Sequence, residues 1–99
     1  MSQAVATSIR VSVRIPTVLR KFTDNEAEVV VDGGTVLDAV RDLTRQYESL
    51  ASHLFDASGT LRSFVNVYVN DEDVRYLDGN DTALKDGDRL AIIPAVAGG

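Results

Sequence analysis

Strand-like alternation dominates this chain, and only one segment has the period of a helix. Residues 8–15 read Ser-Ile-Arg-Val-Ser-Val-Arg-Ile, and residues 64–70 repeat the pattern as Phe-Val-Asn-Val-Tyr-Val-Asn. A period of two predicts strands that bury one face and expose the other. A helical stripe of apolar residues occurs over residues 36–47. The sequence therefore predicts one sheet packed against one main helix.

Two further strands and a helix cap complete the expected order. Residues 27–31 are an apolar run between turn signals, and residues 89–93 follow the tight-turn sequence Lys-Asp-Gly-Asp. Thr35 suits the N-cap of the helix, with Asp38 three residues later. Residues 74–76 are expected to add a brief edge strand. This order predicts an α+β domain whose mixed sheet of four to five strands wraps one helix, with the first and last strands as central neighbours.

Composition limits both the size of the fold and its partners. The 99 residues, 44% of them hydrophobic, suffice for one core and not for two. A net charge of −5 argues against nucleic acid or an anionic membrane as partner, since both require a positive surface. The sequence has no cysteine, so disulfides, thiolate metal ligands and an internal thioester are excluded. Without a transmembrane stretch or secretory signal, the chain is expected in the cytoplasm, as a monomer.

The last residues are the strongest candidate functional feature. Pro94 removes a backbone donor after an apolar strand, which favours a flexible tail over residues 94–99. The chain is thus expected to consist of a flexible leader at 1–8, a domain at 9–93 and this tail. Six extended residues span roughly 20 Å at about 3.3 Å each. Glycine has no Cβ, so a Gly-Gly end can enter a narrow channel. We expect the Gly99 carboxylate to be the reacting group. The residues expected to thread into a partner's active site are Pro94, Ala95, Val96, Ala97 and Gly98. The alternative is a frayed terminus without function.

Other chemistry is poorly supported. His53 is the only histidine, so neither a nucleophilic triad nor a multi-histidine metal site can be built, and a surface or helix-end role is expected. The acidic cluster Asp71-Glu72-Asp73, with Asp78 and Asp81 nearby, lacks the spacing of a calcium loop and predicts a solvated turn. No metal site is predicted.

A docking face is a further hypothesis. Phe64, Tyr68 and Tyr76 are candidates for an apolar partner-binding patch, unless loops or the helix cover them. The carboxylates of Asp71, Glu72 and Asp73 would form an acidic rim against a basic surface of the partner.

The segment 86–99, together with residues 64–70, resembles the ubiquitin-like β-grasp sulfur carriers of the ThiS and MoaD group. Within that group the chain resembles the CysO-type carriers of cysteine biosynthesis, where the similarity also takes in residues 15–20 and 69–75 and covers nearly everything from Ile9 onward. The final Pro-Ala-Val-Ala-Gly-Gly segment is specific to the superfamily and separates its branches poorly.

The resemblance implies a protein co-substrate and not an enzyme. An E1-like adenylyltransferase/sulfurtransferase would use ATP to convert the Gly99 carboxylate to an acyl-adenylate, and a sulfur donor would then leave a covalent thiocarboxylate, with no stably bound cofactor. In the cysteine branch, a pyridoxal-phosphate (PLP)-dependent cysteine synthase using O-phosphoserine would accept the sulfur, and a metalloprotease would release cysteine.

Two alternatives remain open at this stage. A molybdopterin synthase small subunit of the MoaD type would hold the same Gly99 tail permanently in a large partner. A ubiquitin-like modifier or interaction domain would join Gly99 to lysine, or would not react at all.

Overall fold

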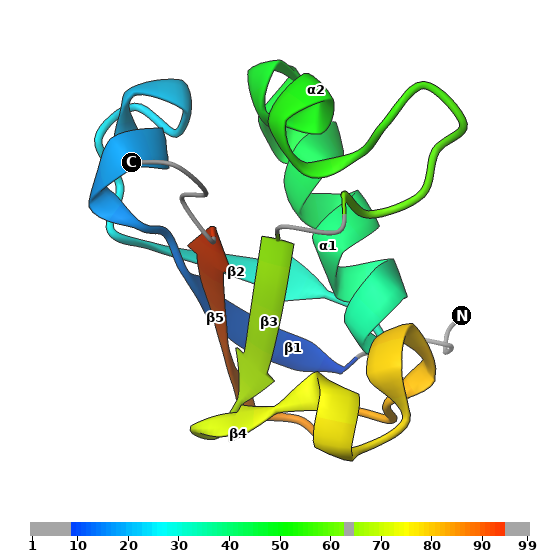
Figure 1. Cartoon of the computed structure of the whole chain (residues 1–99). Helices are drawn as coiled ribbons and strands as arrows, with labels where there is room; N and C mark the ends of the chain where they lie inside the picture. The colour runs from blue at the N-terminus through cyan, green and yellow to red at the C-terminus, as the bar shows by residue number, and fades with distance from the viewer. Residues whose placement is uncertain (1–8, 63–64, 95–99) are drawn as a thin grey trace, which may run out of the picture.

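The computed structural model describes residues 9–62 and 65–94 and contains one five-stranded mixed sheet (Figure 1). The strands are β1 (Arg10–Arg14), β2 (Glu28–Asp32), β3 (Val65–Val69), β4 (Glu72–Asp73) and β5 (Arg89–Pro94). They lie in the order β2-β1-β5-β3-β4, with β1 and β5 parallel and the other pairs antiparallel. The predicted α+β fold, and the pairing of the first and last strands, are confirmed.

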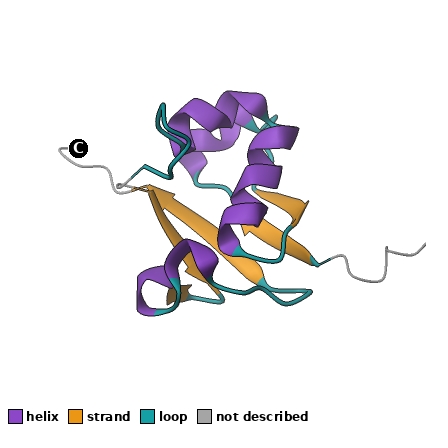
Figure 2. Ribbon diagram, turned by 90° about the vertical axis from the view of Figure 1, so that its right-hand side faces the viewer, coloured by secondary structure: helices purple, strands orange, loops and turns teal. Residues whose placement is uncertain are grey.

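The helix α1 (Val36–Gln46) covers one face of the sheet (Figure 2), and a short α2 (Ala51–Leu54) follows it. Thr35 Oγ1 accepts a hydrogen bond of 3.2 Å from the Asp38 N–H, as the cap sequence predicts. Short 3-10 turns fill the connections. They are η2 (Thr17–Phe22), η3 (Glu48–Leu50), η4 (Val74–Tyr76) and η5 (Gly79–Asp81).

Two differences from the prediction bear on the candidate site. Residues 74–76 form the η4 turn and not an edge strand, because the Asp73 carboxylate accepts the Arg75 N–H at 2.9 Å and bends the chain there. β5 continues to Pro94, one residue beyond the expected end, and pairs with Val65. The Asn70 N–H donates to the Arg89 carbonyl, so alternation along the ladder makes the Val65–Pro94 pair a non-hydrogen-bonded one. Proline therefore costs this ladder no hydrogen bond.

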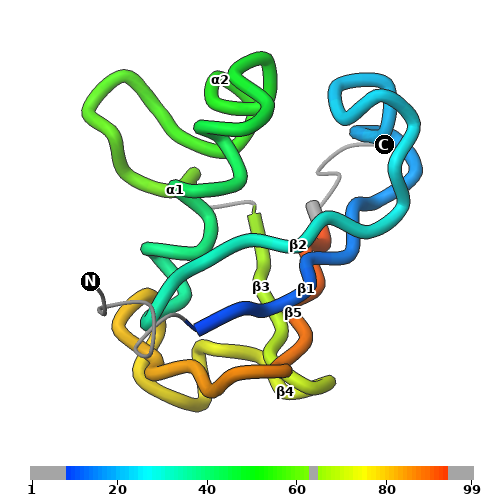
Figure 3. The backbone as a smooth tube through the Cα atoms, turned by 180° about the vertical axis from the view of Figure 1, so that it is seen from behind, coloured from blue at the N-terminus to red at the C-terminus, as the bar shows by residue number. Residues whose placement is uncertain are grey.

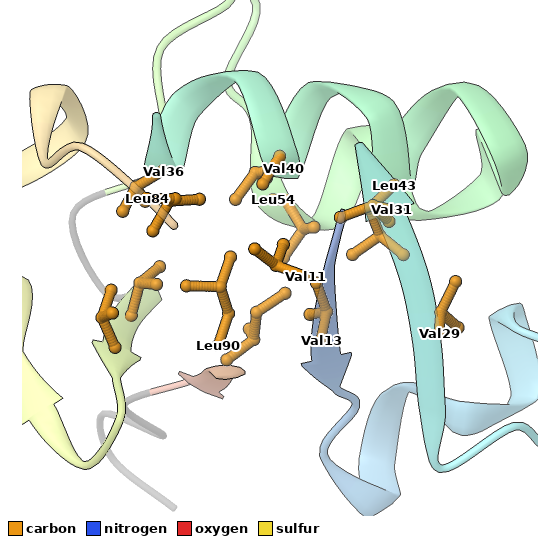
Figure 4. Packing of buried hydrophobic residues seen from close by; sticks show 14 of the residues in the cluster. Val11, Val13, Val29, Val31, Val36, Val40, Leu43, Leu54, Leu84 and Leu90 are labelled. Carbon is orange, nitrogen blue, oxygen red and sulfur yellow. The ribbon is translucent and has the colours of Figure 1, made fainter. Parts of the chain in front are cut away.

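The core lies between the sheet and α1 (Figure 4). The alternating residues of β1 and β5 point into it, and Val13 is fully buried while Leu90 is 1% exposed. From α1, Val36, Val40 and Leu43 have no exposed surface. Burial of such side chains contributes about 1.5–3 kcal/mol each, so the core holds the central strands firmly.

The junction of β2 and α1 is close-packed. A Cβ on Gly33 would lie 2.5 Å from the backbone nitrogen of Ala39, so only glycine fits there. Side chains of α1 also cap the outer edge of β2. The Asp32 N–H donates to Asp42 Oδ2 at 3.0 Å, and Gln46 Nε2 donates to the Val30 carbonyl at 3.1 Å. This edge of the sheet is thereby protected from pairing with another strand.

Candidate functional site

The strand that leads to the chain's last residues is the central one. β5 lies between β1 and β3, and its side chains Leu90 and Ile92 are 1% and 3% exposed. The base of the predicted tail is therefore set on the most constrained strand of the sheet. Pro94 belongs to this strand, and the other predicted tail residues lie outside the described residues. They are Ala95, Val96, Ala97, Gly98 and Gly99.

The predicted aromatic patch is only partly described. Phe64 lies outside the described residues. Tyr68 is half-buried on the sheet face opposite α1, where it pairs with Ala91 of β5. Tyr76 is 80% exposed on η4, beyond the short edge strand β4. Within the described ranges, no ring contact joins Tyr68 and Tyr76, so these two residues do not form an aromatic cluster.

One of the three predicted rim carboxylates is already occupied. Asp73 is buried, and both of its oxygens accept hydrogen bonds from the Arg75 guanidinium, the shortest being Nη2 to Oδ2 at 2.6 Å. These side-chain bonds, followed by the bond from the Arg75 N–H, hold the pKa of Asp73 below its ordinary value. Asp71 and Glu72 are exposed. Only these two remain as candidates for a basic partner.

Replacing Asp73 by Asn is expected to remove a pH-dependent part of the stability. A carboxyl whose pKa is lowered in the folded state stabilises the fold above its unfolded pKa of about 3.9, and that stabilisation is lost as the pH falls through the folded value. Asp73→Asn should therefore be less stable than wild type at pH 7, with the difference shrinking below about pH 4. Urea unfolding at a series of pH values measures this. Asp71→Asn, at an exposed position, is the matched control, and a difference between Asp73→Asn and wild type that stays constant with pH would contradict the assignment.

The acidic turns and the predicted tail lie at opposite ends of β5. At the start of the strand, the Arg89 N–H donates to Asn70 Oδ1 at 3.1 Å, and Asn70 Nδ2 donates to Asp88 Oδ1 at 3.0 Å. From this corner β5 crosses the sheet to Pro94 (Figure 3). The five steps from Arg89 to Pro94, at about 3.3 Å each, place the two ends of the strand roughly 17 Å apart. Asp71 and Glu72 are therefore remote from the point where the chain continues toward Gly99.

The remaining candidates carry little chemistry. His53 lies in the last turn of α2, and its ring centroid is 4.2 Å from that of Phe22, which agrees with the predicted helix-end role. Within residues 9–62 and 65–94, no three His, Cys, Asp or Glu side chains gather in a way that could hold a metal ion. No helix in the same part of the chain is long and apolar enough to cross a membrane.

A feature that the sequence analysis missed is a hollow on the outer face of the sheet. It has a volume of about 330 Å³ and is lined in part by Arg14, Tyr68, Arg89 and Ala91. Alternation along each strand places the two arginines on the polar face. Sequence patterns give neither the strand order nor the register of the strands. Both are needed to show that the two arginines border the same hollow.

Comparison with known proteins identifies the family. The model of the ThiS family matches residues 13–99. The chain belongs to this family. Sulfur carrier protein CysO of Mycobacterium tuberculosis (strain ATCC 25618 / H37Rv) is 46% identical over 93 residues, which cover 92% of this chain and 100% of that protein.

Solved structures agree with this assignment. The crystal structure of the Amycolatopsis orientalis BexX/CysO complex matches with a TM-score of 0.80 and 46% identity, over 90% of this chain and 99% of that one. The solution structure of small archaeal modifier protein 1 from Methanosarcina acetivorans matches with a TM-score of 0.85 and 30% identity, over 93% and 98%. The predicted ubiquitin-like β-grasp fold is confirmed, as is the predicted membership of the ThiS group, in which the M. tuberculosis relative is named a sulfur carrier protein.

Proposed function

We propose that this ThiS-family chain carries sulfur as a thiocarboxylate on Gly99 and delivers it to cysteine biosynthesis. The observation that carries the proposal is that the last described segment of the chain, Arg89–Pro94, is the central strand β5, whose inward side chains are buried. An anchored strand gives the following residues a fixed starting point. The side-chain-free Gly98-Gly99 end can enter a narrow active site.

The chemistry needs an activating partner. A terminal carboxylate, with a pKa of about 3.5, is ionised at neutral pH and can attack the α-phosphate of ATP, releasing pyrophosphate. Sulfide then attacks the acyl-adenylate carbon and AMP leaves, so a C–S bond replaces a C–O bond without oxidation or reduction. In this proposal the activating partner is an E1-like adenylating enzyme, as the resemblance to the ThiS and MoaD carriers implies.

Delivery to cysteine biosynthesis is supported by the 46% identity to M. tuberculosis CysO over that protein's whole length. In this branch a PLP-dependent enzyme with O-phosphoserine as substrate accepts the sulfur, and a metalloprotease restores Gly99. The presence of CysO in a complex with BexX in A. orientalis supports a role in which the carrier docks on separate proteins. Such a role suits the cytoplasm, where all these partners would act.

Intact-mass measurement tests the proposal. The chain ending at Gly99 is incubated with ATP, the E1-like enzyme of the same organism and sulfide, and replacement of one oxygen by sulfur is expected to add about 16 Da. Fragmentation should locate the added mass on the final residue. Omitting ATP is the control. A gain located elsewhere in the chain, or formed without ATP, would overturn the proposal. Adding the PLP enzyme and O-phosphoserine should then give a cysteinyl adduct on Gly99.

A protein modifier is the second candidate, favoured by the 30% identity to the archaeal modifier over 93% of this chain. In that function the Gly99 acyl-adenylate is attacked by a lysine amine of another protein, and no sulfur is needed for the bond. Recovery of lysine-linked conjugates in the absence of the cysteinyl adduct would favour this function. A stable complex with a large subunit on gel filtration would instead favour a molybdopterin synthase subunit.

A further inference from the structure

The outer face of the sheet carries a hollow centred on Ala91. The face opposite α1 is formed by the outward residues of β1, β5 and β3, and in register Arg14 pairs with Ala91 on one side and Tyr68 pairs with Ala91 on the other. Ala91 is much smaller than both of these neighbours. A depression of about 330 Å³ therefore opens above the middle strand.

Two arginines border this depression without partners. Ser12 is the residue opposite Arg89 and Arg14 is opposite Ala91, so the two arginines are diagonal neighbours on adjacent strands. With strands about 4.8 Å apart and an offset of two residues at about 3.3 Å each, their Cα atoms lie roughly 8 Å apart. Both side chains are exposed, and in the described ranges neither guanidinium makes a hydrogen bond or an ion pair. Two positive charges that make no ion pair within the described ranges thus border the same space, in a chain whose net charge is −5.

Negative groups stand only at the flanks of the hollow. Glu28, opposite Arg14 on β2, lines one side, and Asp71 in the β3–β4 turn lines the other. A single carboxylate fits between the arginines, whereas an extended polyanion would meet both of these acids. The charge pattern therefore fits one acidic side chain of a protein and not a nucleic acid or membrane surface.

Apolar surface on the same face adds contact area for a protein. Val30 of β2 is 60% exposed, and Ile93 of β5 is 46% exposed. Both are outward positions of their strands, because their neighbours Val29, Val31 and Ile92 are buried. Exposed aliphatic side chains around a polar recognition point are typical of protein interfaces.

We propose that this outer-face hollow receives an aspartate or glutamate side chain of the adenylating enzyme, held between Arg14 and Arg89 above Ala91. The partner's identity rests on the function proposed above. The carboxylate accepts hydrogen bonds from the two guanidinium groups, which are strong because both partners are charged. Ala91 lies three residues before Pro94 on the same strand. Docking at this point therefore fixes the origin of the segment that leads to Gly99.

Charge-reversal variants of the whole chain test the inference by equilibrium binding to the adenylating enzyme without ATP. Arg14→Glu and Arg89→Glu should each raise the dissociation constant about 30-fold, since a repulsion replaces an attraction. Arg41→Glu is the matched control. It makes the same charge change at an exposed arginine that lies on α1, over the other face of the sheet, and whose guanidinium makes no hydrogen bond or ion pair within the described ranges. This variant should bind within about threefold of wild type.

A charge-neutral variant separates insertion into the hollow from long-range attraction. Ala91→Leu fills the hollow and should weaken binding about tenfold, while Ala57→Leu, at an exposed loop position, should have no effect. Circular dichroism and thermal unfolding confirm that each variant is folded. Unchanged binding of Arg14→Glu and Arg89→Glu overturns the inference, and so does an effect of these reversals that Ala91→Leu does not share.

The same proteins distinguish this inference from the proposed function. If the wild-type chain gains about 16 Da on Gly99 and the arginine variants bind as wild type, the docking inference alone fails. If binding depends on both arginines and on Ala91 but no sulfur is added, the sulfur-carrier proposal fails and the docking inference stands. A wild-type chain that does not bind the enzyme at all overturns the docking inference.

Discussion

Replacing Gly33 by Ala is expected to destabilise the fold by about 3 kcal/mol, because a Cβ at this position overlaps the backbone of α1. The added carbon would lie 2.5 Å from the nitrogen and 2.7 Å from the Cα of Ala39, and both atoms belong to the main chain. No rotamer change relieves such a contact, so the first turn of α1 must move away from β2. The Gly33 N–H also donates to the Ile9 carbonyl at 3.0 Å, which ties the same segment to the chain just before β1.

Gly34→Ala provides the matched control. A Cβ on Gly34 meets no atom within 4 Å, and its backbone does not adopt the left-handed conformation that favours glycine. Thermal unfolding should place Gly33→Ala about 12–24 °C below wild type, with Gly34→Ala within about 4 °C. Equal melting temperatures for the two variants would show that the helix and strand can separate without cost, contrary to the close packing described here.

The regular elements could be predicted from the sequence because local patterns determine them. Alternation over residues 8–15 and 64–70 gave β1 and β3, and the Thr35–Asp38 pair marked the start of α1. The placement of β1 and β5 as central neighbours could be predicted as well, because both strands are apolar, whereas their parallel direction is known only from the structure. Each of these inferences uses residues within one segment, or the need of apolar strands to be buried in the core between the sheet and the helix.

The surfaces could not be predicted in the same way, because they depend on register between distant segments and on local side-chain bonds. From the sequence, Asp73 was expected to be one of three free carboxylates. In the structure its carboxylate accepts hydrogen bonds from the Arg75 N–H, which starts the η4 turn, and from the Arg75 guanidinium, which pairs with its charge. Arg14 and Arg89 border one hollow because β5 aligns Ala91 with Arg14, a fact of register that spans more than seventy residues. Sequence patterns place a side chain on a face, but do not say which side chains meet there.

Removing Gly99 is expected to reduce thiocarboxylate formation by at least about 100-fold, even though the shortened chain still ends in a glycine carboxylate. The loss follows from reach. The carboxylate of a chain ending at Gly98 starts from the same anchored strand β5 but falls short by one residue, about 3.3–3.6 Å. Attack on the α-phosphate of ATP needs the reacting atoms within about 3–3.5 Å of each other, so a displacement of one residue removes the carboxylate from its position. Adding a third glycine after Gly99 should be similarly harmful, since it carries the carboxylate past the phosphate.

Two control variants keep the effect of length separate from the effects of docking and folding. Gly98→Ala preserves the length of the chain and tests whether a Cβ is tolerated in the channel. Deleting residues 1–7 shortens the chain by more residues than the loss of Gly99 does, but it leaves β5 and the residues after it unchanged. This variant therefore tests whether shortening the chain elsewhere has any effect. The rate of the 16 Da gain is measured at saturating carrier, in parallel with binding. For the chain ending at Gly98 this rate should fall, while the dissociation constant stays near that of wild type. Binding is preserved because docking through the sheet face does not involve the last residue. A chain ending at Gly98 that is activated as fast as wild type would show that the anchored strand does not fix the position of the carboxylate, and that the enzyme instead accepts a range of tail lengths.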